Sequence, residues 1–257
     1  TLYRMANEGI KFNEYYQPAW GASTTTGEFS NLIGLVPTMG GSSMNETYQQ
    51  DLFLTMGNQL QKLGYHSTAY HNHLKDFYHR NNTHPALGYD QFIARFGGLD
   101  IKGTWPESDL EMIDVTVPDF IDKQPFSIYY MTVSGHCRYN TRGNKMCAKN
   151  YDVVKDLPIS ETLKSYLACN LELEYGLQHL VQQLEEAGIA DDTVIVLSTD
   201  HYPYGLEPSA TWGNTEDYVA ELYGYDYTNI IQRDHSALIL WSGCIEDMDL
   251  EVHEPVY

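Results

Sequence analysis

Two short motifs combine residue types that are able to bind a metal ion or attack an electrophile. In the first, Asp200 and His201 follow the apolar run at 193–198 (Thr-Val-Ile-Val-Leu-Ser). A carboxylate oxygen and an imidazole nitrogen in adjacent positions suit Zn²⁺ or Mn²⁺. A turn or helix cap is the alternative role for such a dipeptide. Its position directly after an apolar run favours the metal site.

The second motif is a hydroxyl-rich turn at 21–29 (Gly-Ala-Ser-Thr-Thr-Thr-Gly-Glu-Phe). Its side chains would cap a following helix by accepting hydrogen bonds from the first free N–H groups. Alternatively, one threonine is a nucleophile, because metal coordination favours the alkoxide and a helix N-terminus favours incoming anions. A metal-bound threonine that faces a phosphate ester would need no general base beside it.

Apolar patterns predict the elements that must position these motifs. Helices are predicted at 45–63 and 160–187, where leucines recur at helical spacing and Gly188 closes the second one. The run at 193–198 is typical of a parallel strand covered on both faces. Further strands are predicted at 65–70, 126–133 and 237–241. This alternation indicates an α/β fold with a mainly parallel central sheet sandwiched by helices.

Three of the predicted strands end in clusters that contain histidine. His71 and His73 follow the first strand, His136 follows the second, and Asp200 with His201 follows the third. In open α/β sheets the ligand crevice lies beyond the carboxyl ends of the strands, so we expect these side chains in one site. Any one of these histidines alone would more often be a surface or capping residue.

The composition limits the class of protein. The chain has 257 residues, of which 42% are hydrophobic, so we expect one large folded domain instead of a disordered acidic tail. Its net charge of −20 argues against binding nucleic acid or an anionic membrane by bulk electrostatics. No apolar run approaches the length of about 18 residues that spans a bilayer. The chain begins with Thr1 and no signal peptide, as expected of a piece of a longer protein.

The four cysteines carry weaker signals. They form no Cys-x-x-Cys pair, which excludes a thioredoxin motif or a zinc ribbon. Cys137 and Cys147 are ten residues apart in a loop-like stretch and would suit a disulfide in an oxidising compartment, with two free thiols as the alternative. Cys169 falls on a predicted helix, where we expect a small core residue.

Five segments, taken in order, resemble the lipoteichoic acid synthase group, which are phosphoglycerol transferases of the alkaline phosphatase/sulfatase superfamily. They are the motif at 21–29, Gly-Tyr-x-Ser-x-x-Tyr-His at 64–71, Thr-Val-Ser-Gly-His at 132–136, the Leu-x-x-Ala-Gly helix end at 184–188, and Asp-Thr-Val-Ile-Val-x-x-x-Asp-His at 192–201. The resemblance covers nearly the whole chain at similar spacing. It implies one sulfatase-like catalytic domain over residues 1–257.

The resemblance implies catalytic and metal-binding roles for four residues. Thr24, four residues before Glu28, matches the family's nucleophilic, metal-bound threonine. Asp200 and His201 match two metal ligands. His136 matches a histidine that contacts the phosphoglycerol headgroup and assists proton transfer.

The resemblance also implies further residues of the headgroup pocket. These are His71, Tyr78 and Arg80, although the family often has a tryptophan where Tyr78 stands. Arg80 makes chemical sense independently, because a guanidinium binds two phosphate oxygens at once.

The implied reaction is a two-step displacement on phosphatidylglycerol. Thr24 attacks the phosphorus, diacylglycerol leaves, and a glycolipid or polyglycerolphosphate acceptor takes the phosphoglycerol group from the threonine. One divalent metal, Mn²⁺ with Zn²⁺ or Mg²⁺ as alternatives, would activate Thr24 and neutralise developing charge. The resemblance places such a domain on the extracellular face of the cell membrane, reached only through an N-terminal anchor, with no nucleic-acid partner.

The chain also departs from the family's pattern. The family's metal site uses a glutamate at the end of a strand before the first helix, and residues 1–9 correspond to that helix. We therefore expect the first strand, the membrane anchor and a final helix to lie outside this sequence, and the chain as given to bind metal weakly or not at all. No cysteine stands in the Cys/Ser-x-Pro-x-Arg context of true sulfatases. Asp234-His235 precedes a predicted strand, so we expect it to be structural.

Three functions stay open at this point. The leading one is metal-dependent phosphoglycerol transfer in lipoteichoic acid-type synthesis. The same threonine–metal core would also serve a phosphoethanolamine transferase or a phosphodiesterase of the superfamily. The third is a catalytically incomplete binding fragment, because one metal ligand is expected to be missing.

Overall fold

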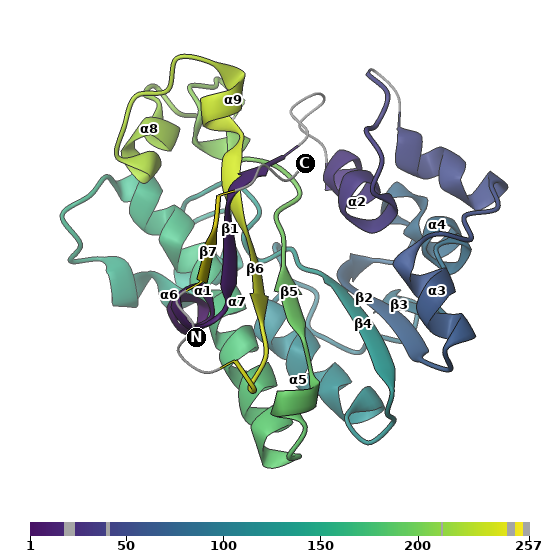
Figure 1. Ribbon diagram of the computed structural model, residues 1–257. Coiled ribbons are helices and arrows are strands. Elements are labelled where there is room, and N and C mark those ends of the chain that lie inside the picture. The colour runs from purple at the N-terminus through teal and green to yellow at the C-terminus, as the bar shows by residue number, and fades with distance from the viewer. Residues whose placement is uncertain (18–23, 40–41, 212, 246–249, 254–257) are drawn as a thin grey trace.

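Two β-sheets form the framework of the computed structural model, which describes residues 1–17, 24–39, 42–211, 213–245 and 250–253 (Figure 1). One sheet has the strand order β5-β6-β1-β7, with strands β1 (Ile10–Tyr16), β5 (Ile195–Leu197), β6 (His235–Trp241) and β7 (Leu250–Val252). The other has the order β3-β2-β4, with strands β2 (His66–Leu74), β3 (Gln91–Arg95) and β4 (Phe126–Met131). The two sheets lie side by side, with β5 and β4 at the facing edges.

The two sheets differ in strand direction. Strand β2 runs parallel to both of its neighbours, with Tyr70 opposite Ile93 of β3 and Tyr130 of β4. In the other sheet β6 is antiparallel to β1 and β5, whereas β7 is parallel to β1. The carboxyl ends of β2, β3 and β4 therefore share one edge, as a ligand crevice at that edge requires.

The helices connect and cover these strands. The α-helices are α1 (Leu2–Glu8), α2 (Thr24–Ile33), α3 (Met56–Lys62), α4 (Arg80–Ala86), α5 (Asp109–Phe120), α6 (Lys145–Val154), α7 (Glu161–Glu186), α8 (Tyr218–Tyr223) and α9 (Ile230–Arg233). Short 3₁₀ turns are η1 (Ser43–Gln49), η2 (Phe77–His79), η3 (Ala190–Asp192) and η4 (Tyr204–Leu206). Within the described residues, no helix combines the length and apolar character that crossing a bilayer requires.

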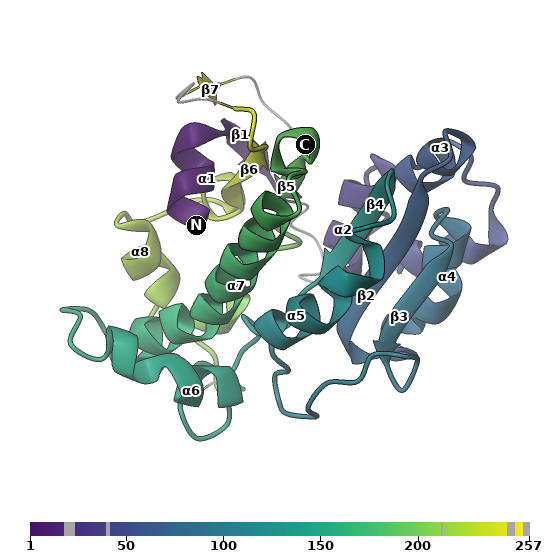
Figure 2. The ribbon, with the colours of Figure 1, turned by 90° about the horizontal axis from the view of Figure 1, so that it is seen from below.

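The parallel sheet is covered on both faces. Successive side chains of a strand point to opposite faces, so Ala69 and Tyr70 of β2 enter different cores. Tyr70 packs with residues of α5 and α7, whereas Ala69 packs with η1 and residues of α2. Helix α7 joins the two sheets, because Leu184 belongs to the core beneath β2 and Val181 to the core beneath β6 (Figure 2).

Most of the predicted elements are confirmed, including the α/β class. Helix α7 matches the prediction at 160–187: Ser160 Oγ accepts the N–H of Leu163 at 3.2 Å, and Gly188 ends the helix with φ +70°. The predicted strands at 65–70, 126–133 and 237–241 are β2, β4 and β6, and the helix expected within 1–9 is α1. Asp234-His235 leads into β6, where His235 lies opposite Tyr16 of β1, in line with a structural role.

The helix predicted at 45–63 is wrong in its extent. It divides into η1 and α3, because Thr55 between them is extended with ψ 151°. Thr55 Oγ1 donates to the carbonyl of Leu87 at 2.8 Å, and a Cβ on Gly57 would lie 2.5 Å from that same oxygen. The segment therefore turns to fit against the end of α4, which leucine spacing does not encode.

The strand predicted at 193–198 is present as β5 but is neither parallel nor covered on both faces. It pairs antiparallel with β6, and Val194 and Val196 are 64% and 53% exposed. An apolar β-branched run indicates a strand but carries no information about the direction of its neighbour.

Candidate active site

The N-terminus of α2 lies directly against Asp200. A Cβ on Gly27 would lie 2.0 Å from the carbonyl oxygen of Asp200 and 2.4 Å from its Cα, so only glycine permits this approach. Thr24, the first residue of α2, lies one turn before Gly27 on the same face of the helix. The fold therefore brings the helical turn that begins with the predicted nucleophile against the backbone of one predicted metal ligand. Residues 21–23 of the hydroxyl-rich motif lie outside the described residues.

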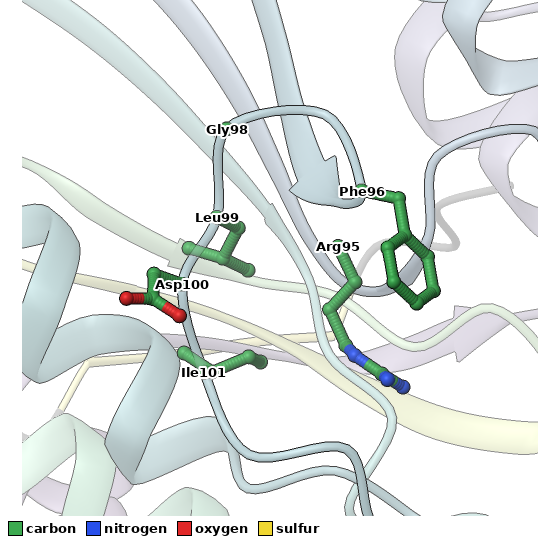
Figure 3. Close-up of a pocket in the computed structure, with 6 residues that line it drawn as sticks. All are labelled: Arg95, Phe96, Gly98, Leu99, Asp100 and Ile101. Carbon is green, nitrogen blue, oxygen red and sulfur yellow. The ribbon is translucent and has the colours of Figure 1, made fainter.

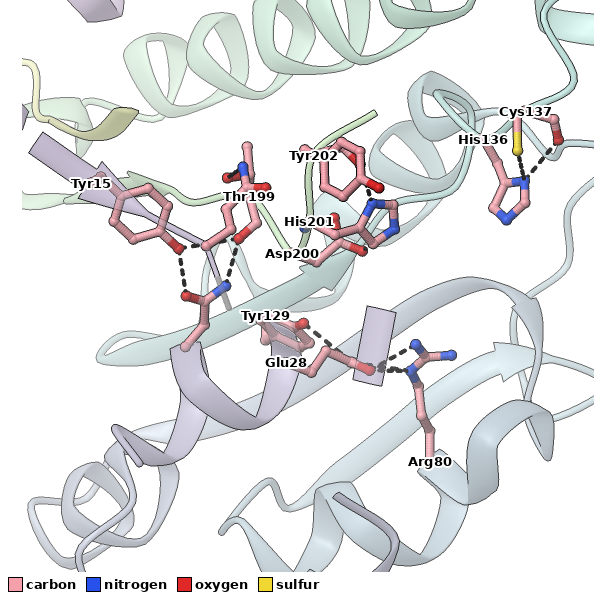
Figure 4. Close-up of polar contacts among 12 residues, drawn as sticks. Tyr15, Glu28, Arg80, Tyr129, His136, Cys137, Thr199, Asp200, His201 and Tyr202 are labelled. Atoms are coloured by element: carbon pink, nitrogen blue, oxygen red, sulfur yellow. Dashed lines mark hydrogen bonds and ion pairs between the residues drawn. The ribbon is translucent and has the colours of Figure 1, made fainter. Parts of the chain in front are cut away.

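Two polar side chains fix the residue that precedes Asp200. Tyr15 of β1 donates its hydroxyl to the carbonyl of Thr199 at 3.1 Å and to Asn31 Oδ1 at 2.8 Å. Asn31 of α2 donates to the same carbonyl at 3.0 Å (Figure 4). Burial raises the pKa of Tyr15 to about 12, so its hydroxyl stays a donor at neutral pH.

The Asp200 and His201 side chains face one another. His201 Nδ1 lies 2.8 Å from the carbonyl oxygen of Tyr202, so Nδ1 carries the proton and donates it to that carbonyl. In the neutral ring Nε2 then has a lone pair, and it lies 3.2 Å from Asp200 Oδ2 (Figure 4). Two acceptors at this distance repel each other unless a proton or a cation lies between them. A carbonyl that fixes the tautomer is also the usual support of a metal-binding histidine.

The donor set fits a divalent metal in part. Within the described residues, no three side chains of histidine, cysteine, aspartate or glutamate are grouped as ligands. Asp200, His201 and the Thr24 hydroxyl would supply two oxygens and one nitrogen, which suit Mn²⁺, Zn²⁺ or Mg²⁺. The metal-binding roles of these residues stay predictions.

Glu28 and Arg80 form a buried ion pair beneath this site. Arg80 donates from Nη2 to Glu28 Oε2 at 2.7 Å and from Nε to both carboxylate oxygens at 3.0 Å (Figure 4). Each side chain is about 1% exposed. His84 Nε2 lies 3.5 Å from Glu28 Oε1, and the Tyr129 hydroxyl donates to the same oxygen at 3.3 Å. One carboxylate thus ties α2 to α4 and β4.

Electrostatics keep Glu28 ionised. Burial alone would raise its pKa, but the charge and hydrogen bonds of Arg80, together with the nearby His84 ring, outweigh this and hold the pKa at about 2. Sequence reasoning quoted Glu28 only as part of a motif and gave His84 no role. The one available signal was the spacing of four residues between Thr24 and Glu28, which predicts a shared helix face.

Arg80 contacts protein on each of its nitrogens. Its Nη1 lies 3.4 Å from His71 Nε2, while Nε and Nη2 bind Glu28. Its Cζ lies 5.3 Å from the centre of the Tyr78 ring, which is 40% exposed. Arg80 therefore supports His71 and Tyr78 from inside the protein, and its expected contact with a phosphate stays a prediction.

His71 is a neutral, buried imidazole. Its Nδ1 lies 2.9 Å from the carbonyl of Met131, to which it donates, so Nε2 is the acceptor that faces Arg80. Burial, followed by the charge of Arg80, lowers the pKa of His71 to about 3. Its ring thus stays uncharged at neutral pH.

An aromatic side chain that sequence reasoning missed joins two of the histidine clusters. The Trp105 ring packs edge-on at 5.0 Å from His136 and at 5.3 Å from His73. His73 Nδ1 lies 3.1 Å from the buried carboxylate of Glu107. His136 Nδ1 donates to the carbonyl of Cys137 at 2.8 Å, which leaves Nε2 as the ring nitrogen not engaged by that carbonyl. No pattern in the sequence pointed to Trp105 or Glu107.

The segment after His201 connects Asp200 and His201 to the loop that carries His136. The Tyr204 ring lies 4.8 Å from the His201 ring. A Cβ on Gly205 would lie 2.6 Å from the Cβ of Cys137, so the backbone at Gly205 packs closely against the Cys137 side chain. The structure therefore brings together the N-terminus of α2, Asp200-His201 and the His136 loop, with His71 and Tyr78 held by Arg80.

A separate open pocket of about 350 Å³ follows β3 (Figure 3). It is lined by Arg95, Phe96, Gly98, Leu99, Asp100 and Ile101. None of the predicted site residues lines it.

Comparisons with known proteins agree with the motifs. The model of the sulfatase family matches residues 1–240. Lipoteichoic acid synthase-like YvgJ from Bacillus subtilis is 23% identical over 202 residues, which are 77% of this chain but only 32% of YvgJ. The chain thus spans about a third of the length of this curated relative.

Solved structures share the fold. The lipoteichoic acid synthase LtaP from Listeria monocytogenes superposes with a TM-score of 0.74 at 21% identity, over 97% of this chain and 60% of that one. The Streptococcus pyogenes phosphoglycerol transferase GacH, solved with sn-glycerol-1-phosphate, gives 0.62 at 14% identity, over 95% of this chain and 61% of that one. The resemblance to sulfatase-like enzymes of the lipoteichoic acid synthase group is confirmed. Because the family match covers nearly all of its length, the chain belongs to the sulfatase family.

Proposed function

We propose that this chain is the catalytic domain of a metal-dependent phosphoglycerol transferase that acts on the headgroup of phosphatidylglycerol. The acceptor would be a glycolipid or a polyglycerolphosphate chain, as in lipoteichoic acid-type synthesis. The main support is the contact of Gly27 with Asp200, because Gly27 lies one helical turn after Thr24 at the N-terminus of α2. The similarity to lipoteichoic acid synthases supports the choice of substrate.

The chain's own residues would carry the transfer. The Thr24 oxygen attacks phosphorus, the bond to the diacylglycerol oxygen breaks, and a phosphoglycerol-threonine forms; an acceptor hydroxyl then displaces the threonine. His136 Nε2 would give a proton to the leaving oxygen and later take one from the acceptor, because Nδ1 is engaged with a carbonyl. Asp200 and His201 would hold the divalent metal, which when bound lowers the pKa of a coordinated hydroxyl and offsets negative charge.

His71 and Tyr78 would bind the glycerol-phosphate group. The neutral His71 is fixed by Met131 and Arg80, and the half-exposed Tyr78 stacks on Arg80. The buried Arg80 supplies the positive charge next to His71 and Tyr78. Because the net charge of −20 repels anionic lipid, recognition falls to this cluster and the metal. We place such a domain on the outer face of a cell membrane, held there by sequence outside these residues.

The test is a threonine exchange in the full-length protein. Thr24→Ala should reduce diacylglycerol release from phosphatidylglycerol by about 10³-fold or more, since the nucleophile is lost. Thr26→Ala, two residues away in the same turn, is the matched control and should retain activity. Phosphatidylethanolamine, assayed in parallel, tests the headgroup. Unchanged release by Thr24→Ala would refute the mechanism, and faster turnover of phosphatidylethanolamine would refute the substrate.

A further inference from the structure

Two buried cysteines meet where α6 packs on α7. Cys147 and Cys169 are both fully buried, and they belong to one apolar cluster with Val154 and Ala168. All four cysteines are free thiols in the structure, and Cys244 alone is exposed. Cys137 and Cys147 are thus two free thiols, the alternative to the disulfide considered from the sequence. Cys147 shares its cluster instead with Cys169, a cysteine 22 positions along the chain.

Contacts on both sides hold these two thiols together. Asn150, one turn after Cys147 in α6, donates its amide to the carbonyl of Ala168 at 3.2 Å and to Glu172 Oε2 at 3.0 Å. These two acceptors flank Cys169 on α7. Cys147 and Cys169 lie in the same buried cluster between the two helices. A disulfide needs Cβ atoms within about 4.5 Å, and two cysteines that share one buried cluster across docked helices are placed to meet that requirement.

We propose that Cys147 and Cys169 are a disulfide-forming pair that links α6 to α7. A low-molecular-weight disulfide, such as oxidised glutathione, would serve as the oxidant. The Cys147 thiolate attacks it and releases one thiol as a mixed disulfide forms. Cys169 then attacks the Cys147 sulfur and releases the second thiol, so two cysteine thiols are oxidised and one disulfide is reduced to two thiols.

Local structure favours Cys147 as the attacking group. It is the third residue of α6, and its N–H is capped by Asn144 Oδ1 at 2.9 Å, so the thiol lies at a helix N-terminus that stabilises a thiolate. Burial, in contrast, raises the pKa of Cys137 to about 11. The oxidant would reach the pair before α6 has docked on α7, since neither sulfur is exposed in the folded chain.

Peptide mapping tests the pairing directly. The 257-residue chain is refolded in mixed reduced and oxidised glutathione, alkylated, and digested with trypsin under non-reducing conditions. Cys137, Cys147, Cys169 and Cys244 fall in different tryptic peptides, at 124–138, 146–149, 165–233 and 234–257. We expect 146–149 joined to 165–233, and alkylation of Cys137 and Cys244 only.

Matched variants make the result decisive. Cys137→Ser should keep the crosslink between 146–149 and 165–233, whereas Cys169→Ser should abolish it. The oxidised chain should also melt at a higher temperature than the reduced one. Alkylation of all four cysteines after oxidative refolding would overturn the proposal, and so would a crosslink from 146–149 to 124–138. None of these readouts depends on transferase activity, so they are independent of the proposed function.

Discussion

Replacing Glu28 by glutamine tests whether the buried ion pair organises the site. The change keeps the volume but removes the charge, which leaves Arg80 buried and uncompensated. Removing one partner of a buried pair costs about 3–5 kcal/mol. The pKa gives an independent figure: about 2 in the folded chain against an ordinary 4.5 corresponds to about 3 kcal/mol at about 1.4 kcal/mol per pKa unit. Both routes predict a loss of about 3 kcal/mol from the free energy of unfolding.

Urea denaturation, followed by tryptophan fluorescence and circular dichroism, measures this loss. The matched control is Glu185→Gln, because Glu185 pairs with Arg4 at 3.3 Å on the surface, where both side chains are about half exposed. That variant should lose less than about 1 kcal/mol. The double variant Glu28→Gln/Arg80→Met removes the orphaned charge and should be more stable than Glu28→Gln alone. A cost for Glu28→Gln no larger than for Glu185→Gln would refute the reasoning.

The same variant predicts a pH dependence with a definite sign. The folded-state pKa of Glu28 lies below the unfolded value, so its contribution is fully present above about pH 5 and is lost as pH falls from 4.5 towards 2. The difference in unfolding free energy between the original chain and Glu28→Gln should therefore shrink over that range. A difference that stays constant between pH 6 and pH 3 would mean that the carboxylate charge is not what stabilises the fold.

Three further changes test other contacts. Gly27→Ala should displace α2 from Asp200, lower the free energy of unfolding measured in urea by about 1–3 kcal/mol, and reduce lipid turnover in the full-length protein. The control is Gly143→Ala, because the nearest atom to a Cβ there is 3.4 Å away. Equal effects from the two variants would contradict the prediction. The Cys147–Cys169 disulfide closes a loop of roughly 20 residues, so its reduction should cost about 3 kcal/mol in the same assay, and no effect of reductant would contradict it. The His71 ring, with a pKa of about 3, should show nuclear magnetic resonance shifts that stay constant from pH 8 to 5, and a transition within that range would contradict its buried, neutral state.

The sequence predicted those parts of the fold whose signals are local. Helix α7 has an N-cap, an apolar stripe and a terminal glycine within one segment, and its limits were predicted to within one residue. Strand β1 was missed, because its charged residues Lys11 and Glu14 interrupt the apolar pattern of a strand. Strand β5 was predicted with the wrong direction, since its pairing with β6 depends on residues 42 to 46 positions away. What the sequence did not reveal is which elements become neighbours.

For the candidate site, too, the local signals were predicted and the long-range contacts were not. Asp200, His201 and His136 were predicted to lie together because they follow strand ends, and the structure gathers the loops that carry them. The partner of Arg80 was not predicted, because Glu28 is 52 residues away and any anion would satisfy a guanidinium. A motif therefore indicates which functional groups are present but not whether another side chain of the protein already binds them.

Two glycines permit close contacts that help to set the geometry of this site. Gly27 brings α2 against the Asp200 backbone, and Gly205 brings the chain after His201 against Cys137, the neighbour of His136. A side chain at either glycine would overlap atoms nearer than 3 Å and separate two of the three parts of the site. The ion pair of Glu28 acts on the same helix as Gly27, so both hold α2 in place. Transfer chemistry should therefore be lost when these supports change, even though none of them touches the phosphorus.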